Sequence, residues 1–213
     1  MKKSLMLITV LLGLSSFGWA GACGVSTLSI YDTPGFSCTI GDKTFSGFTY
    51  SAGGSNPRQA AGVTVDVVAT GREQGLLFTS VWEAANGRTS TAVIGYTVTE
   101  VGKLLLDDAE LGMSAFGHRD PTVNESAGGA SLFAFYDGST NPPAFRLDDF
   151  AKFPAVASLN VQDTLFVGGT GKGRTGITRV FNGFSEVPEP GTLTLFGSGL
   201  MALAGFARRR VRR

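Results

Sequence analysis

The chain has 213 residues and a formal net charge of +1, but its charged residues are unevenly distributed. Two lysines lie at the N-terminus and five arginines in the last six residues, which leaves 11 basic and 16 acidic residues between positions 23 and 186, a balance of −5. This acidic middle segment is long enough for one domain with a core, and it lacks the basic patch that a nucleic-acid-binding domain requires.

Residues 1–22 have the layout of a secretory signal peptide. Two lysines are followed by an apolar stretch, Leu5 to Leu14, which we expect to be helical, and then by a run of small residues. Cleavage after Ala20 and cleavage after Ala22 both fit this run, and the sequence does not choose between them. The alternative is an uncleaved N-terminal anchor, although the apolar stretch is short for a membrane span.

The two cysteines, Cys23 and Cys38, predict a disulfide. They lie 15 residues apart in a chain that we expect to be exported to an oxidising compartment. On the chain-entropy model, closing such a loop stabilises a fold by about 3 kcal/mol. Acylation of Cys23, as in a lipoprotein, is the alternative. Two thiols and the single histidine, His118, do not supply the four ligands of a structural zinc site, so we predict no metal.

Alternation of apolar and polar residues with a period of two dominates the middle segment and is typical of half-buried strands. The segments with this pattern are 44–50, 63–67, 76–82, 92–101, 103–109, 111–116, 130–136, 157–161, 164–167 and 177–184. In the first of them we expect Phe45, Gly47 and Thr49 on one face, and Phe48 and Tyr50 on the other.

Clusters of Gly, Pro and Asn separate these segments, for example at 53–57, 86–87, 137–138 and 141–143. Many short strands joined by such turns predict an all-β fold, and the uneven strand lengths favour an antiparallel β-sandwich over a closed barrel. We therefore expect one extracellular β-sandwich domain over residues 23–186, either jelly-roll-like or Ig-like.

Three groups of residues were considered for chemistry. Residues 171–176 fit G-x-G-x-x-G, but a strand-like segment follows instead of the helix that a dinucleotide site needs, which indicates a hairpin loop. Carboxylates at 107, 108, 110, 148 and 149 include adjacent pairs, which point to opposite faces of a strand and predict solvated charges, with calcium as the alternative. His118 could act as the base of a Ser-His-Asp triad, but the sequence contains no G-x-S-x-G motif to supply the nucleophilic serine. We predict no catalytic residue and no cofactor.

The C-terminal segment, 187–213, has three physically distinct parts. Pro188, Glu189 and Pro190 favour extended, accessible backbone. The apolar run 191–207 would span about 26 Å as a helix, slightly less than a bilayer core. The arginines that follow would hold the end of the chain on the cytoplasmic side; they are Arg208, Arg209, Arg210, Arg212 and Arg213. The alternative is a plain transmembrane anchor that nothing cleaves.

This tail resembles the PEP-CTERM sorting tail of bacterial exosortase substrates. The resemblance implies export, transient anchoring in the inner membrane with the domain in the periplasm, and cleavage near Pro188-Glu189-Pro190 by a membrane-embedded transpeptidase-like enzyme, an exosortase. It further implies a Gram-negative producer of exopolysaccharide. Residues 38–50, with the upstream Cys23, resemble the opening of a group of PEP-CTERM proteins without an assigned activity.

Sequence and resemblance together predict a non-enzymatic surface or exopolysaccharide-matrix protein. A carbohydrate-binding module on the same tail is the alternative, followed by a hydrolase whose site is built from distant strands. Aromatic residues are expected mainly in the core, although some could form a face on which sugar rings stack. The aromatic residues considered are Trp82, Tyr31, Tyr50, Tyr96 and Tyr136.

Overall fold

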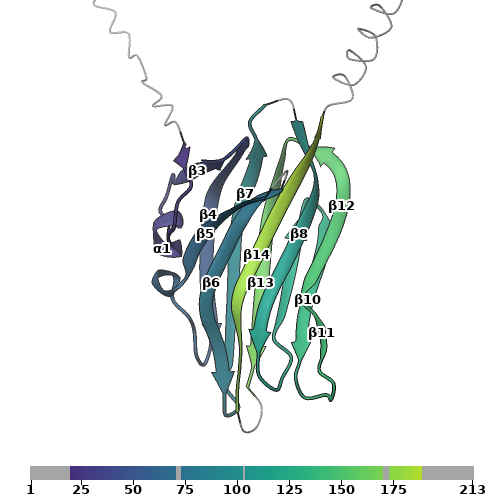
Figure 1. The fold of residues 1–213 in the computed structure, drawn as a ribbon. Helices are drawn as coiled ribbons and strands as arrows, with labels where there is room; N and C mark the ends of the chain where they lie inside the picture. The colour runs from purple at the N-terminus through teal and green to yellow at the C-terminus, as the bar shows by residue number, and fades with distance from the viewer. Residues whose placement is uncertain (1–19, 71–72, 103, 170–172, 189–213) are drawn as a thin grey trace, which may run out of the picture.

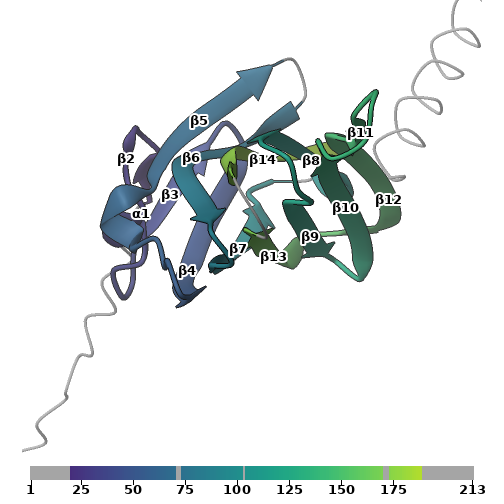
Figure 2. The same cartoon turned by 90° about the horizontal axis from the view of Figure 1, so that it is seen from below.

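The computed structural model describes residues 20–70, 73–102, 104–169 and 173–188, which form two β-sheets packed face to face (Figures 1 and 2). The elements are β1 Gly21–Ala22, β2 Ser26–Thr27, α1 Leu28–Tyr31, β3 Ser37–Ile40, β4 Lys43–Gly54, the 3-10 helix η1 Ala60–Gly62, β5 Thr64–Thr70, β6 Glu73–Ala85, β7 Thr89–Glu100, β8 Leu104–Phe116, β9 Thr122–Ala127, β10 Ala130–Asp137, β11 Ala144–Arg146, β12 Asp148–Val156, β13 Ser158–Gly168 and β14 Arg174–Pro188. The predicted all-β sandwich is confirmed.

Strand order within the sheets is that of a jelly roll with added edge strands. One sheet, here sheet A, has the order β1-β3-β4-β7-β13-β9-β10-β11, and sheet B has the order β12-β8-β14-β6-β5-β2. From β6 to β9 the chain crosses between the sheets at each connection, β9 and β10 form a hairpin, and β12, β13 and β14 again alternate between the sheets. This winding is the double Greek key of a jelly roll.

The core lies between the sheets and consists of the inward residues of both. In β7 every second residue is buried, and β13 has the same alternation. Trp82 from β6 and Tyr96 from β7 are buried, as is Tyr31 from α1, so the core assignment of these three aromatics is confirmed. Tyr50 and Tyr136 are half-buried at its margin.

Several predicted strands are parts of longer ones. Residues 104–109 of the first predicted segment and all of 111–116 fall in one strand, β8, and residues 158–161 and 164–167 fall in another, β13. The polar residues that suggested breaks face outward or pair with partners inside the sandwich, so the backbone ladder continues through them. Strands β3, β9 and β12 were not predicted: β3 has only four residues, β9 is rich in polar residues, and the apolar residues of β12 do not alternate regularly.

The predicted facing of residues in β4 is wrong after Ser46. A β-bulge places Gly47 and Phe48 together opposite Tyr96, and Gly47 adopts a φ of +63°, which glycine tolerates best. The extra residue reverses the alternation, so Phe45 and Phe48 both point into the core. Phe48 then stacks on Tyr96 with ring centroids 5.4 Å apart.

The predicted disulfide between Cys23 and Cys38 is present, so neither thiol is free. It joins the segment after β1 to β3, and β1 pairs with β3 through Gly21 and Ala22 at the edge of sheet A. An edge strand of two residues cannot hold itself in place by hydrogen bonds alone. The bridge therefore fixes the N-terminal end of the domain to the sheet.

Replacing Cys23 and Cys38 together by serine should lower the free energy of unfolding by about 3 kcal/mol, because the unfolded chain regains the entropy of the open loop. Urea unfolding followed by tryptophan fluorescence measures the change. Dithiothreitol should destabilise the wild type by a similar amount and leave the double variant unchanged. Identical urea midpoints for oxidised wild type and variant would show that the bridge contributes nothing.

Candidate functional site: the exit of strand β14

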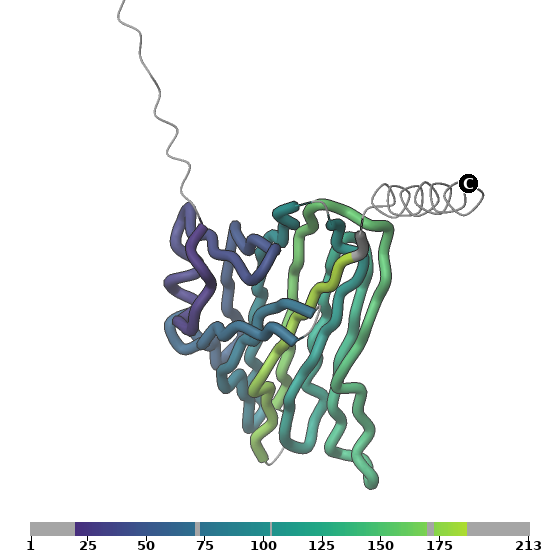
Figure 3. Tube along the Cα trace, turned by 45° about the horizontal axis from the view of Figure 1, so that its top comes forward, coloured from purple at the N-terminus to yellow at the C-terminus, as the bar shows by residue number. Residues whose placement is uncertain are grey.

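Strand β14 leads directly from the middle of the sandwich to the C-terminal segment. It lies between β6 and β8 in sheet B and pairs with both (Figure 3). Its pairing with β8 continues through Val187 opposite Leu105 to Pro188 opposite Leu104. Pro188, the first residue of the Pro-Glu-Pro sequence, is thus the last residue of a structural strand, and no spacer separates the two.

The outer side of this strand end is fixed by Ser185. Its backbone N–H donates to Asp108 Oδ1 at 3.0 Å, and its hydroxyl donates to Asp108 Oδ2 at 2.7 Å. Asp108 on β8 is itself buried. The prediction of a solvated charge at this position is therefore wrong, because a register shift between Ser185 and Glu186 brings a donor pair to the carboxylate.

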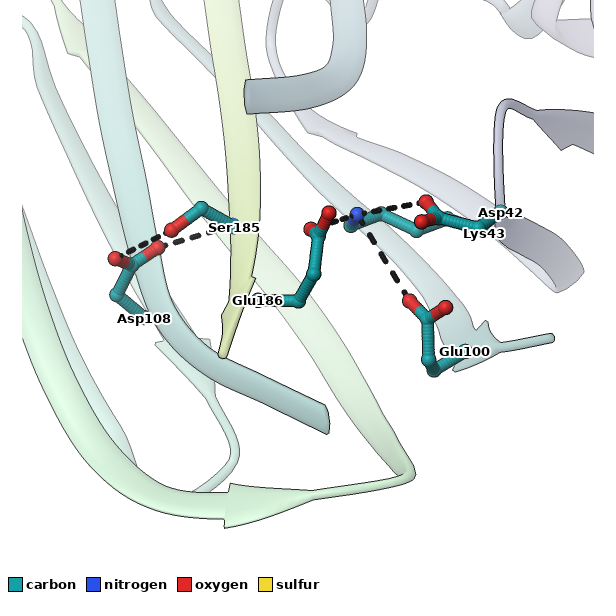
Figure 4. A network of polar contacts seen from close by, with 6 residues as sticks. All are labelled: Asp42, Lys43, Glu100, Asp108, Ser185 and Glu186. Atoms are coloured by element: carbon teal, nitrogen blue, oxygen red, sulfur yellow. Dashed lines mark hydrogen bonds and ion pairs between the residues drawn. The ribbon is translucent and has the colours of Figure 1, made fainter. Parts of the chain in front are cut away.

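The inner side is fixed by an ion cluster around Lys43, the first residue of β4 (Figure 4). The Lys43 ammonium is fully buried and donates to Glu186 from the opposite sheet. It also lies 3.1 Å from Asp42 Oδ1 and 3.8 Å from Glu100 Oε2. The cluster, which we call the Lys43 clamp, therefore connects the exit of β14 to the β3–β4 turn and to the end of β7.

The clamp holds three carboxylates against one ammonium. Ligand oxygens of Asp42, Glu100 and Glu186 lie within 4.8 Å of one another, a spacing that a divalent cation could use. The Lys43 ammonium already supplies positive charge at this point. Burial raises the pKa of Glu100, nearby Asp42 adds to the rise, and Lys43 opposes it. The arrangement is suited to holding two sheets together at the exit.

Replacing Lys43 by methionine should lower the free energy of unfolding at pH 7 by about 3 kcal/mol, because buried carboxylates lose their countercharge. The loss should shrink near pH 4, because burial raises the pKa of Glu100 and protonation neutralises that carboxylate there. Chemical denaturation at both pH values measures the effect, and Lys152→Met on the exposed part of β12 is the control. A loss that is the same at both pH values would contradict the clamp as an electrostatic element.

A second polar cluster lies deep between the sheets. Glu125 on β9 and Asp163 on β13 are direct cross-strand partners, and both are buried. Asn182 on β14 donates its side-chain N–H groups to both, at 2.9 Å to Asp163 Oδ1. Sequence reasoning missed these acids, although each occupies the apolar phase of its strand, Glu125 between Val123 and Ala127.

Burial raises the pKa of both acids, that of Asp163 to about 7 and that of Glu125 well above its ordinary value, and the Asp163 charge raises the latter further. The folded state therefore binds protons more tightly than the unfolded state. The stabilising effect is fully present below the unfolded pKa of about 4 and is lost as the pH rises towards 7. The cluster favours the fold in mildly acidic surroundings.

Replacing Glu125 by glutamine should flatten the decline in stability between pH 4 and pH 7, because a neutral amide removes one of the two facing acids. The wild type should lose on the order of a few kcal/mol across this interval. Thermal or urea unfolding at several pH values provides the measurement. Asp148→Asn, at an exposed position of β12, is the matched control and should leave the slope unchanged. A wild-type stability that rises over the same interval would contradict the assignment.

Other sequence candidates lie apart from one another. His118 is exposed in the β8–β9 connection, and a strand, not a helix, begins within residues 171–176, at Arg174. Asp149 accepts hydrogen bonds from the Phe133 backbone N–H and from Arg146, whereas Asp148 is exposed. Adjacent acids thus point apart, as predicted.

Two shallow depressions lie on the outer side of sheet B. The larger, about 580 Å³, is lined mainly by Arg58, Ser80, Thr178 and Arg179 and contains no carboxylate among its lining residues. The smaller, about 330 Å³, contains Glu83, which forms an ion pair with Arg174. Neither depression brings two carboxylates together within the part of the chain that the structure describes.

The terminal predictions fall largely outside the described residues. These are the signal region up to position 19, Glu189, Pro190, the apolar run 191–207 and the arginines at 208–210, 212 and 213. Within the described ranges, no helix combines the length and apolar character that crossing a membrane requires. Ala20 and Ala22 are described, and Ala22 belongs to β1.

Comparison with known proteins bears on the C-terminal segment. Residues 186–213 match the model of the PEP-CTERM protein-sorting motif. No curated protein matches the chain. Among solved structures, the enzymatically active domain of tailspike protein 4 from bacteriophage CBA120 aligns with 13% identity and a TM-score of 0.30, covering 66% of this chain and 19% of that chain. A likeness this weak supports no statement about activity.

The sorting motif places the chain among exported proteins whose C-terminal tails anchor them in a membrane before release. The chain thus carries a PEP-CTERM sorting motif, which supports processing by exosortase-type machinery, and the matched segment begins within the last three residues of β14.

Proposed function

We propose that this protein is a non-enzymatic component of the cell surface or exopolysaccharide matrix, delivered by exosortase-type processing at the exit of β14. The observation that carries the proposal is the direct continuity between a central structural strand and the sorting motif. Cleavage beyond Pro188 leaves every strand of the sandwich intact, so the released product is a complete domain.

The positions of the two chain ends support the proposal. Gly21 pairs with Cys38 in β3, two residues before Ile40, and the β3–β4 turn carries the Lys43 clamp that holds Glu186. Both ends of the domain therefore leave from the same end of the sandwich (Figure 1). A signal segment and a membrane tail can occupy one membrane at the same time without straining the domain.

Retention of β1 favours one of the two signal cleavage points. Cleavage after Ala20 keeps Gly21 and Ala22, which pair with Cys38 and Thr39. Cleavage after Ala22 would remove this strand and leave only the hydrogen bond from the Cys23 backbone N–H to the Thr39 carbonyl, with the disulfide, at the edge of β3. We therefore assign the mature N-terminus to Gly21.

Carbohydrate binding is the second candidate function, and a specific feature of the surface favours it. Phe133 and Phe135 on β10 stack with ring centroids 5.8 Å apart and an interplanar angle of 21°. Phe133 is solvent-exposed. An exposed aromatic ring with a second ring beside it is suited to the apolar face of a sugar ring.

The intact mass of the protein recovered outside the cells tests the main proposal. We expect a chain that begins at Gly21, carries the bridge between Cys23 and Cys38, and ends close to Pro188-Glu189-Pro190. Replacing these three motif residues by alanine should leave the tail uncleaved and the protein in the membrane fraction. The control variant replaces Asn141, Pro142 and Pro143 by alanine. These residues lie in the β10–β11 turn, remote from the exit of β14, so processing should be unchanged.

Recovery of the full-length chain from the cytosol, with both ends intact and both thiols free, would overturn the proposal. A mass increase that corresponds to an acyl chain on Cys23 would instead identify a lipoprotein and exclude the disulfide.

A further inference from the structure

The outer face of sheet A is uncharged over most of its width. Outward residues of β3, β4, β7, β13 and β9 are almost all Ser, Thr, Asn, Gln or Gly, and none carries a formal charge. Neighbouring strands place these side chains in register: Thr97 donates to Asn160 Oδ1 at 2.9 Å, and the hydroxyls of Thr99 and Ser158 lie 2.8 Å apart. The outer face of sheet A therefore presents ordered hydroxyl and amide groups and, over these strands, no charged side chains.

Sheet B differs sharply on its outer side. Its outward residues include Glu73, Glu83, Glu110, Arg174 and Arg179. Burial, together with hydrogen bonding to Glu110, raises the pKa of Glu73 to about 7. Since charged side chains cover one face of the sandwich and avoid the other, the neutral face is a specific property of sheet A.

Aromatic side chains interrupt the neutral face at one place, on β13 and β10, with β9 between them. Phe166 on β13 lies opposite Thr122 on β9, which lies opposite Phe135 on β10. In the next row Thr164, Asn124 and Phe133 are paired in the same order. These six residues form a two-by-three array, here called the aromatic grid, in which Phe166 is 46% and Phe133 is 36% exposed.

The aromatic grid combines two kinds of contact within a small area. Adjacent strands lie about 4.8 Å apart, so the two rows present rings on both sides of a central pair of polar side chains, Thr122 and Asn124. A pyranose ring has an apolar face and a rim of hydroxyl groups. Aromatic rings match that face, and hydroxyl and amide groups on β9 and β13 match the rim.

We propose that the aromatic grid and the neutral face around it bind a neutral polysaccharide. Charge favours a neutral polymer over an anionic one: the face offers no cation between β3 and β9, Arg146 opposite Phe135 is already paired with Asp149, and the domain as a whole is acidic. A protein-protein contact of ordinary stability would instead be expected to bury a larger apolar centre than three phenylalanines. This inference rests on the proposed function as a matrix component and names what that component holds.

The test uses the full-length chain in a polyoxyethylene detergent, whose headgroup contains no sugar, so that it does not depend on export or cleavage. Native affinity electrophoresis with hydroxyethylcellulose, dextran or mannan should retard the protein in at least one case. Carboxymethylcellulose, which has the same backbone as hydroxyethylcellulose with carboxylates added, should not retard it. Binding should be unchanged at high salt, because no charge pairing is involved.

Phe133→Ala and Phe166→Ala should each weaken binding to the retarding polysaccharide by about tenfold. Phe150→Ala is the matched control: Phe150 is 53% exposed but lies on β12 in the other sheet, and its loss should leave binding unchanged.

Three results would overturn the inference: no retardation by any of the neutral polymers, retardation by carboxymethylcellulose alone, or equal loss with all three phenylalanine variants. The alternative occupant of the face is a second copy of this chain, and analytical ultracentrifugation tests for it by measuring the oligomeric state. A dimer that dissociates in the Phe166→Ala variant would identify the face as a self-association surface instead. Failure here leaves the sorting proposal standing, because intact mass and localisation test that proposal separately.

Discussion

The insertion of the last two strands into the middle of both sheets is the constraint on which the rest of the structure depends. Strand β13 lies between β7 and β9 in sheet A, and β14 lies between β6 and β8 in sheet B. Without them, each sheet would be split into two pieces with unpaired edges. The C-terminal strand is thus indispensable to the sandwich and is also the strand that continues into the sorting segment. The same strand, β14, is therefore needed for the stability of the domain and leads into the sorting motif.

This sharing explains why polar side chains gather at the exit of β14. If the following segment pulls on the end of a strand, the strand separates from its neighbours first at that end, because the fewest backbone hydrogen bonds have to break there. The Lys43 clamp and the Asp108–Ser185 pair fix opposite sides of the strand just before the motif begins. Both contacts join particular atoms of segments that lie far apart in the sequence. Because ion pairs and hydrogen bonds depend on position and direction, they oppose local opening of the strand at one defined place, whereas apolar packing is not directional.

Sequence patterns were sufficient for the class of fold but not for the site. The alternation in β6, β7 and β14 is visible in the sequence because their inward residues are apolar. The Lys43 clamp could not be predicted, because Lys43 and Glu186 lie 143 positions apart in the sequence and meet only when the two sheets pack together. Glu125 and Asp163 each occupy the apolar phase of their strand, but only the register shows that they lie opposite each other. The bulge at Gly47 has no signal in the period-two pattern, and it alone reverses the facing of Phe48.

The placement of both chain ends on one side of the sandwich has a consequence for reach. Ser158, at the start of β13, pairs with Thr99 beside the clamp, whereas Phe166 lies eight residues further along the same strand. At about 3.4 Å per residue, that separation is roughly 27 Å. The aromatic grid therefore lies towards the end of the sandwich opposite to the one from which β14 leaves, well separated from the Pro-Glu-Pro sequence.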